Sequence, residues 1–448
     1  MLKLVRDFFI DCQTRAVRYS IWKSLENLEA QLSGEGDIDV VFDPQQRSEV
    51  SALLAEHAFI LDANSSATVG KDVLVHRGFD RPSGGFISLH VHFNCRFGSK
   101  THKECRYIYE QEMFRDFVPH EEIQRLCDGH FFTIRLLSVA MRETPDDPFI
   151  EEIACRYEEG IAARDGAILD ERIPTYFDCT PAVLFQDVRA RGVVALHDRQ
   201  SIVAAAIDAG EARSDYARQA EATKRPRSLR SRLMKVLGRS RNKLNRPAQI
   251  VVAGVDGAGK TTVCWLLRKK FSAIGPAYVI YLGRREWSSV NHWVDRRRVG
   301  AGPLAWLMRQ VWPLSSTAEL LSRAGNGWAR KWLLGAFVIY DRALYDVVMK
   351  FSGGYGPAGR VARTVVNFAA ARHGDFHYML EVPVEVAQSR KPAGKYTIPY
   401  LRDTQDRLST LLPDRYVRLD SGASDADEIA NQIVARYFEA AVTWPRRY

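Results

Sequence analysis

One short stretch constrains this 448-residue chain more than any other: Gly-Val-Asp-Gly-Ala-Gly-Lys-Thr at 254–261. An apolar run at 249–255 precedes it, and apolar residues at helical spacing continue from 262 to 271. Glycines let the backbone curl so that successive N–H groups point at one anion, and a helix N-terminus adds partial positive charge there. The pattern therefore predicts a strand, a phosphate-binding loop and a helix.

This loop predicts a site for ATP and Mg²⁺. The Lys260 ammonium would reach the β- and γ-phosphates, and the Thr261 hydroxyl is placed to ligate magnesium. The predicted ATP-binding residues are Gly254, Asp256, Gly257, Ala258, Gly259, Lys260, Thr261 and Thr262.

The region from 248 to 448 alternates between strand and helix. Strands are predicted at 249–255, 278–282, 337–341, 378–382 and 416–419, and the last predicted helix spans 425–441. Strands separated by helices favour a parallel sheet with helices on both faces. We expect an α/β domain with a doubly wound parallel sheet.

Three segments of this domain resemble the thymidylate kinase family. VVAGVDGAGKTT resembles that family's E-G-x-D-G-x-G-K-T-T loop, with Ala253 in place of the glutamate. FVIYD followed by Arg342 resembles its Asp-Arg motif, and LEVPVEVAQSRK resembles the strand, turn and arginine that lead into its lid. The resemblance covers about 200 residues, 248–448.

The resemblance implies roles for individual residues. Arg342 would hold the acceptor phosphate, Asp256 would contact an acceptor hydroxyl, and Asp341 would join Thr261 around magnesium. Arg390 would neutralise charge on the transferred phosphoryl group, so the implied catalytic residues are Lys260, Arg342 and Arg390. Arg284-Arg285-Glu286 resembles an Arg-Glu-Pro loop of the family, which makes Arg285 a candidate acceptor contact.

A second motif lies near the amino terminus, at 34–43 (GEGDIDVVFD). Asp37 and Asp39 are two positions apart on a predicted strand at 38–42, so both carboxylates project from one face and could bind magnesium. The segment resembles the G-x-D-x-D signature of the nucleotidyltransferase (polymerase-β-like) fold. That fold normally adds a carboxylate from a later strand.

The candidate later strand is 85–94. Its alternation places Ile87, Leu89, Val91 and Phe93 on one face and Ser88, His90, His92 and Asn94 on the other, with no acid. Two readings stay open: an active nucleotidyltransferase, or an α+β domain of that type that has become a binding or regulatory module.

We expect four parts: residues 1–117, which resemble a nucleotidyltransferase, a helical region at 118–223, a basic linker at 224–247 that its composition sets apart, and the domain at 248–448. Residues 1–30 are also expected to be helical. Between Lys224 and Arg246 ten Lys or Arg occur with no Asp or Glu, so the net charge of +9 belongs to this segment and the rest sums to −1. It is either a solvated linker or a basic helix contacting anionic membrane or nucleic acid.

The N-terminus has acidic residues at Asp7 and Asp11, and no apolar run reaches the length of a membrane span, so we expect a cytoplasmic protein. Seven scattered cysteines without a C-x-x-C pair suggest reduced thiols.

The expected activity is transfer of the ATP γ-phosphoryl group to a nucleoside monophosphate or similar small phosphate or hydroxyl acceptor. One alternative is a sugar or metabolite kinase with a linked or degenerate nucleotidyltransferase head, because proteins with this head and tail resemble ones associated with bacterial surface-polysaccharide pathways. The other is an ATP-binding switch that docks membrane or RNA through its linker.

Overall fold

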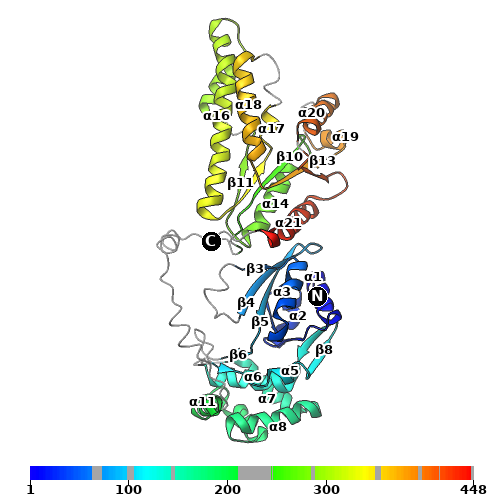
Figure 1. Ribbon diagram of the computed structural model, residues 1–448, viewed down its shortest axis with the longest axis vertical. Helices are drawn as coiled ribbons and strands as arrows, with labels where there is room; N and C mark the ends of the chain where they lie inside the picture. The colour runs from blue at the N-terminus through cyan, green and yellow to red at the C-terminus, as the bar shows by residue number, and fades with distance from the viewer. Residues whose placement is uncertain are drawn as a thin grey trace. The chain divides into compact units, whose positions relative to one another are not determined.

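We describe the protein from a computed structural model, which describes residues 1–62, 73–97, 105–142, 147–209, 244, 246–283, 288–348, 355–391, 396–412 and 414–444 (Figure 1). The chain forms two compact units, Met1–Arg230 and Ser231–Tyr448. Most of the basic segment 224–246, and the Arg284–Glu286 motif with Arg285, lie outside the described residues. None of the described helices is long and apolar enough to cross a membrane.

The amino-terminal unit is built on a seven-stranded mixed sheet in the order β3-β4-β5-β2-β1-β9-β8. Parallel pairing joins β2 to β5 and β1 to β9, and the other neighbours are antiparallel. The strands are β1 (Tyr19–Ile21), β2 (Asp37–Phe42), β3 (Ile60–Leu61), β4 (Val73–Asp80), β5 (Gly85–His92), β8 (Phe117–His120) and β9 (Ile123–Leu126). A two-stranded ribbon adds β6 (Arg96–Phe97) and β7 (Cys105–Arg106).

Alternation along β5 sets the inner face of this sheet. Ile87, Leu89 and Val91 are buried, as is Phe93 just beyond the strand, so the predicted apolar face is confirmed. The same core takes Val5, Phe8, Phe9 and Cys12 from α1, which lie at helical spacing. The helices around the sheet are α1 (Lys3–Thr14), α2 (Leu28–Leu32), α3 (Arg47–Glu56) and α5 (Glu110–Met113).

Two expectations for this unit are wrong at the level of secondary structure. Residues 19–21 form β1 inside the stretch 1–30 that we expected to be helical. Strands β8 and β9 occupy 117–126, so the sheet continues past the expected boundary at 117 into the region predicted to be helical.

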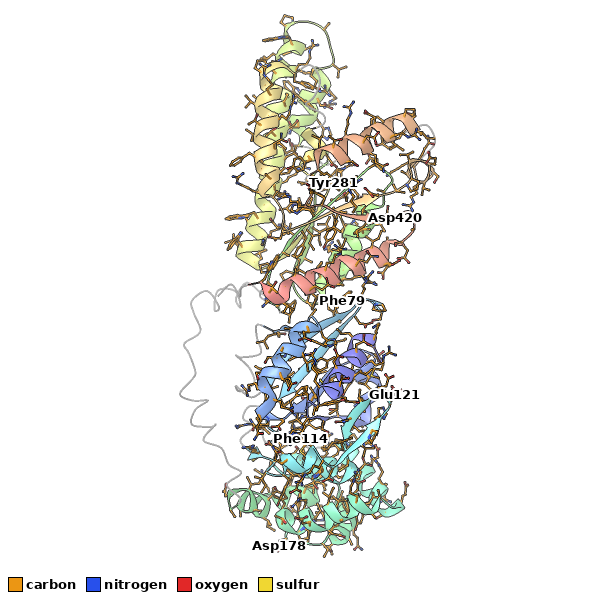
Figure 2. The ribbon with its side chains drawn as sticks, turned by 45° about the vertical axis from the view of Figure 1, so that its right-hand side comes forward. Phe79, Phe114, Glu121, Asp178, Tyr281 and Asp420 are labelled. Atoms are coloured by element: carbon orange, nitrogen blue, oxygen red, sulfur yellow. The ribbon has the colours of Figure 1, made fainter. Side chains whose placement is uncertain are left out.

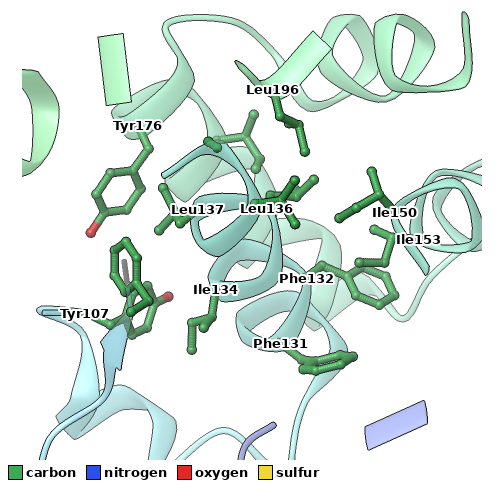
Figure 3. Close-up of a cluster of buried hydrophobic side chains, with 14 of the residues drawn as sticks. Tyr107, Phe131, Phe132, Ile134, Leu136, Leu137, Ile150, Ile153, Tyr176 and Leu196 are labelled. Carbon is green, nitrogen blue, oxygen red and sulfur yellow. The ribbon is translucent and has the colours of Figure 1, made fainter. Parts of the chain in front are cut away.

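Beyond β9 the described residues are mostly helical, as predicted, and they share a core with residues that precede β8. Aromatic and aliphatic side chains including Tyr107, Phe132, Leu136, Ile150 and Tyr176 pack together in it (Figure 3). The helices are α6 (Asp128–Ala140), α7 (Pro148–Glu159), α8 (Ala163–Phe177), α9 (Pro181–Arg191), α10 (Val194–His197) and α11 (Gln200–Ala209).

The carboxy-terminal unit confirms the predicted α/β architecture. Its five strands are all parallel, in the order β11-β12-β10-β13-β14. The chain enters at the central strand, winds to one edge, then continues to the other, which is a doubly wound sheet. The strands are β10 (Gln249–Gly254), β11 (Ala277–Tyr281), β12 (Phe337–Asp341), β13 (Phe376–Glu381) and β14 (Val417–Asp420).

Helices cover both faces of this sheet (Figure 1). On one face, Phe271 of α14 stacks on Phe337 and Tyr437 of α21 meets both rings edge-on. On the other, α16 approaches so closely that a Cβ on Gly327 would clash with Tyr340. The helices are α14 (Lys260–Ser272), α15 (Ser289–Arg297), α16 (Pro303–Leu334), α17 (Tyr345–Val348), α18 (Gly356–Arg372), α19 (Val384–Ser389), α20 (Ile398–Leu411) and α21 (Ala426–Thr443).

The carboxyl ends of the parallel strands meet at one edge of the sheet. Tyr281 and Asp420, which end the two edge strands β11 and β14, are labelled in Figure 2. The chain leaves β10 in the middle of this edge, where the strand order reverses. Ligands of open parallel sheets bind at such a point.

Candidate active site

The glycine loop connects β10 to α14 as predicted. Gly254, Gly257 and Gly259 have φ values of 145°, 101° and 84°, which side-chain-bearing residues rarely adopt. The loop also passes close to its neighbours, because a Cβ on Gly254 would lie 2.7 Å from the Leu380 carbonyl oxygen and one on Gly257 would lie 2.2 Å from that of Ala387. Gly259 immediately precedes α14, so the loop delivers its N–H groups to a helix N-terminus.

Lys260 lies in the hollow of this loop and is only 5% exposed. Its ammonium donates hydrogen bonds to the carbonyl oxygens of Gly254 and Val255, at 2.8 and 2.7 Å. Burial, with the nearby Arg342 guanidinium, lowers the pKa of Lys260 to about 8. The lysine is therefore a buried cation whose charge is costly in the folded chain and would be stabilised by a phosphate.

Thr261 and Asp341 form an oxygen-rich pair beside the loop. The Thr261 hydroxyl donates a hydrogen bond to Oδ2 of Asp341 at 2.7 Å. Asp341 ends β12 and is buried, and its Oδ1 has no hydrogen-bond partner among the residues that the structure describes. Hydroxyl and carboxylate oxygens are the ligands that Mg²⁺ prefers, directly or through water. An unpaired buried carboxylate oxygen next to a phosphate-binding loop fits a magnesium ion.

Arg342 follows Asp341 with a left-handed φ of 94°, which is rare for a residue with a side chain. Its guanidinium donates a hydrogen bond to Asp256 and lies 3.6 Å from Oδ2 of Asp346. Burial alone would lower the pKa of Arg342, but Asp346 and Asp256 outweigh it and hold that pKa above its ordinary value. The strained backbone of Arg342 thus directs its permanently charged guanidinium toward the loop.

Asp256 is the point where several groups of the site meet. Burial would raise the pKa of this carboxyl, but Arg342 and Lys260 outweigh it and lower the pKa. Lys391 adds to this field, and the Tyr396 hydroxyl hydrogen-bonds to Asp256. The Asp256 carboxylate therefore lies between Lys260 of the loop and Arg342 at the end of β12.

A cavity of about 1120 Å³ opens over these groups. Lys260, Thr261, Asp341, Arg342 and Asp256 all line it, so the structure brings together the predicted residues of the loop and of the Asp-Arg motif.

Arg390 is also on the wall of this cavity, as the residue that ends α19. Its guanidinium contacts the carbonyl oxygens of Gly257, at 3.5 Å, and Ser421, at 3.0 Å. It thereby joins the loop to the segment after β14. Lys391 lines the cavity beside it.

Several residues that line the cavity or contact its lining side chains escaped the sequence analysis. Asp346 lies four residues after Arg342 in α17, a spacing that could have suggested the pair. Tyr281 places its ring under the Arg342 guanidinium, 5.7 Å from it, and Trp265 lies on the cavity side of α14. Tyr396 comes from beyond β13. Aromatic residues at these positions carry no local signal of a site.

The amino-terminal carboxylates lie on one sheet face, as predicted, because Asp37 pairs with Ser88 and Asp39 with His90. Asp39 contacts His92 Nε2 at 2.6 Å, Lys23 Nζ at 3.5 Å and His90 Nδ1 at 3.6 Å. Burial would raise the pKa of Asp39, but Lys23 and the two histidines outweigh it and hold the pKa well below its usual range. Asp37 is 52% exposed and lies 3.5 Å from His90.

A metal site at Asp37 and Asp39 stays a prediction. Within the described part of the chain, no group of three or more His, Cys, Asp or Glu side chains is arranged to hold a metal ion. The nearest groups to Asp39 are a lysine and two histidines, in the position where the nucleotidyltransferase resemblance would place metal ions.

Three comparisons with known proteins found similarity to solved structures alone. No family model matches the chain, and no curated protein does. Among solved structures, the chain is similar to thymidylate kinase from Candida albicans, with 16% sequence identity and a TM-score of 0.34 over 44% of this chain and 93% of that one. The interpretation of the site therefore rests on its own geometry.

Proposed function

We propose that the carboxy-terminal unit transfers the γ-phosphoryl group of ATP to a small acceptor that carries a phosphate or hydroxyl group. The observation that supports this most directly is the pairing of Arg342 with Asp256 beside Lys260, in one cavity. A protein that only held ATP would need the loop and its lysine. A second fixed guanidinium on the same cavity suits an acceptor that is itself anionic.

In this proposal the chain acts by positioning charge. The loop N–H groups and Lys260 hold the β- and γ-phosphates, and Arg342 holds the acceptor. Thr261 and Asp341 would hold Mg²⁺, which neutralises phosphate charge when bound. Arg390, already joined to the loop through Gly257, would lie near the charge of the transferred group.

Asp256 supports an acceptor that carries a hydroxyl group. Its carboxylate is held on the cavity wall by Arg342 and Tyr396, where it can accept a hydrogen bond from an acceptor hydroxyl. This is compatible with the sugar of a nucleoside monophosphate, the acceptor implied by the resemblance to thymidylate kinases. It is equally compatible with a phosphorylated sugar.

The test is ADP release by the purified chain with ATP and Mg²⁺, screened against nucleoside monophosphates, sugars and sugar phosphates. Lys260→Ala should reduce the rate of acceptor-dependent ADP release by about 100-fold or more. Lys269→Ala, an exposed lysine on the same helix, is the matched control and should leave it unchanged. If ATP binds but no acceptor accelerates ADP release, the transfer activity is wrong and an ATP-binding switch replaces it.

We also propose that the amino-terminal unit binds a nucleotide or another anion rather than catalysing nucleotidyl transfer. Support comes from Asp39, because its carboxylate is paired with the side chains of Lys23 and His92. Titration calorimetry with ATP and CTP, each with and without Mg²⁺, tests this in a Lys260→Ala background. If the chain releases pyrophosphate and Asp39→Asn abolishes that release, the proposal that this unit only binds its ligand is wrong.

A further inference from the structure

The turn between α15 and α16 exposes apolar residues at its apex. Residues 299–308 (VGAGPLAWLM) carry no polar side chain, and every residue from Val299 to Leu304 is exposed. Val299, Leu304 and Trp306 are 77%, 51% and 62% exposed. Turns between helices are ordinarily polar, and a run of exposed apolar residues is unfavourable unless it serves a function. The apex is therefore a surface that the fold itself does not use.

This apex stands well beyond the sheet. Further along α16, Arg323 donates hydrogen bonds to the carbonyl oxygens of Tyr281 and Gly283, at the carboxyl end of β11. From Pro303 to Arg323 the helix rises about 30 Å, at about 1.5 Å per residue. In Figure 1 the upper ends of α16 and α18 extend past the strands. The apex thus projects from the edge of the sheet that also carries the candidate active site.

The two helices are held together just below the apex. Arg298 pairs with Asp295 at 2.7 Å, donates a hydrogen bond to the Tyr355 hydroxyl and lies over the Trp312 ring. Trp312 is buried and stacks on Tyr355, just before α18. These contacts fix the hairpin beneath its apolar end, so a partner would meet a preformed surface.

Arginines flank the apex on both sides. Residues 289–310, which we call the hairpin tip, contain four Arg and one Asp, a net charge of +3. The single acid, Asp295, is paired with Arg298. Among the described residues no acidic side chain pairs with Arg296, Arg297 or Arg309. The hairpin tip therefore places positive charge, which no described acid neutralises, beside an exposed apolar apex.

We infer that the hairpin tip docks on the surface of an anionic phospholipid membrane. The apolar side chains of the apex would enter the boundary between headgroups and acyl chains, and the flanking arginines would face the lipid phosphates. Trp293 is exposed and has the Arg297 guanidinium 4.3 Å over its ring. Tryptophan and arginine side chains both favour the headgroup level, because each combines an apolar body with a polar end.

Other partners fit the hairpin tip less well. Two copies that met tip to tip would bring arginines of like charge together, with no acid between them. Nucleic acid would supply phosphates for Arg296 and Arg297 but no apolar medium for Val299 and Leu304. An anionic membrane supplies both, with its phosphates outside its apolar interior, and the hairpin tip likewise has its apolar apex beyond its arginines.

Flotation of the full-length protein with lipid vesicles tests this docking. The wild type should float with vesicles of phosphatidylcholine and phosphatidylglycerol and far less with vesicles of phosphatidylcholine alone. Added salt should release it, because salt screens exposed charges. Docking needs neither ATP nor an acceptor, so flotation is measured without nucleotide, and its result does not depend on the phosphoryl transfer proposed above.

Substitutions in the hairpin tip separate its apolar part from its basic part. Val299→Ser and Trp306→Ser should each lower the affinity for anionic vesicles by about five- to ten-fold, because less apolar surface enters the membrane. Trp306→Phe keeps a large apolar ring and should retain most of the affinity. Arg296→Gln combined with Arg297→Gln should lower the affinity by about ten-fold or more.

Matched controls come from exposed positions elsewhere. Val183→Ser removes an exposed valine from α9. Arg402→Gln combined with Arg407→Gln lowers the net charge equally at exposed positions of α20. Both controls should float like the wild type. All the substituted side chains are exposed, and an unchanged melting temperature shows that each variant folds.

Three results would overturn the docking. In the first, the wild type does not float with anionic vesicles. In the second, the hairpin-tip variants float like the wild type, and replacing the arginines of the basic linker abolishes flotation, which would assign membrane contact to the linker. In the third, a protein that does not float binds single-stranded RNA through the hairpin tip, which would assign this surface to nucleic acid.

Discussion

Arg342 donates a hydrogen bond to the Asp256 carboxylate across 86 residues of sequence, and this contact joins the end of β12 to the glycine loop. Arg342→Ala should destabilise the carboxy-terminal unit by about 2 kcal/mol, because Asp256 would keep its burial and lose its nearest cation. A double-mutant cycle with Asp256→Ala should give a coupling of about 1–3 kcal/mol.

Urea unfolding followed by tryptophan fluorescence measures this cycle selectively. All tryptophans but Trp22 lie in the carboxy-terminal unit, so the signal reports that unit. Additive effects of the two substitutions would show that the pair does not stabilise the fold. Arg342→Lys is the conservative control. It keeps a cation but loses the planar fork, and should recover part of the stability.

Two loop glycines offer a matched comparison. A Cβ on Gly257 would lie 2.2 Å from the Ala387 carbonyl oxygen, whereas one on Gly259 would meet no described atom within 4 Å, and both residues have positive φ. Gly259→Ala should therefore lower the free energy of unfolding only by the backbone strain, about 1 kcal/mol. Gly257→Ala should cost about 2–3 kcal/mol and should also abolish ATP binding. Equal losses of stability and affinity in the two variants would contradict the close approach of α19 to the loop.

The carboxy-terminal unit was predictable from sequence because its strands are short, mostly apolar segments that alternate with helices. Strand boundaries such as that of β12, Phe337–Asp341, agree with the prediction because Asp341 interrupts the apolar run where the strand ends. The loop motif then placed Lys260 and Thr261 at the centre of the sheet. Local patterns were sufficient here, since parallel strands bring their carboxyl ends to one edge.

The amino-terminal unit shows where local patterns fail. Ile21, Leu25 and Leu28 lie at helical spacing, yet residues 19–21 form β1, buried between β2 and β9. Pairing with distant strands overrides the local period, and the sequence carries no sign of it. Likewise, neither the approach of Lys23 to Asp39 nor the left-handed backbone of Arg342 could be inferred before the fold was known.

Asp341 should control the magnesium requirement. Its Oδ1 is buried and has no hydrogen-bond partner within the described part of the chain, and its Oδ2 accepts a hydrogen bond from Thr261. Asp341→Asn should raise the Mg²⁺ concentration for half-maximal ADP release by about 10–100-fold. Asp403→Asn, an exposed carboxylate on α20, is the control and should have no effect. An unchanged magnesium dependence in Asp341→Asn would remove this residue from the metal site.

Lys23 should stabilise the amino-terminal unit through Asp39. Because the pKa of Asp39 is lowered in the folded chain, its ionised form adds stability above the usual carboxyl pKa, and this contribution is lost as pH falls through the lowered value. Lys23→Met should lower the free energy of unfolding by roughly 1–2 kcal/mol at pH 7. The difference in this free energy from wild type should shrink below about pH 4. Calorimetry of the whole chain across this pH range measures the effect.

The control for this prediction is Lys3→Met. Lys3 pairs with Asp7, but its side chain is 58% exposed, so the substitution should have little effect at any pH. A loss in Lys23→Met that persists unchanged into acid would mean that Lys23 contributes by packing on the Trp22 ring, from which its ammonium lies 4.0 Å.

Lys260 should give stability and ATP affinity opposite dependences on pH. Its pKa is lowered from 10.5 to about 8 in the folded chain, so between these values the unfolded chain binds more protons. Stability without nucleotide should therefore rise with pH, by about 2 kcal/mol between pH 7 and 9.5. ATP affinity should fall over the same range, because a neutral amine no longer attracts phosphate.

Urea unfolding and ATP titration of the same samples at pH 7 to 9.5 test both trends. Lys260→Met should remove the rise in stability that is due to this residue, while Lys269→Met should keep it. Bound phosphate favours the charged amine, so nucleotide should shift the midpoint of the stability change toward higher pH. If Lys260→Met keeps the wild-type slope, the loop lysine is not the titrating group, and the buried cation does not set the electrostatics of the phosphate site.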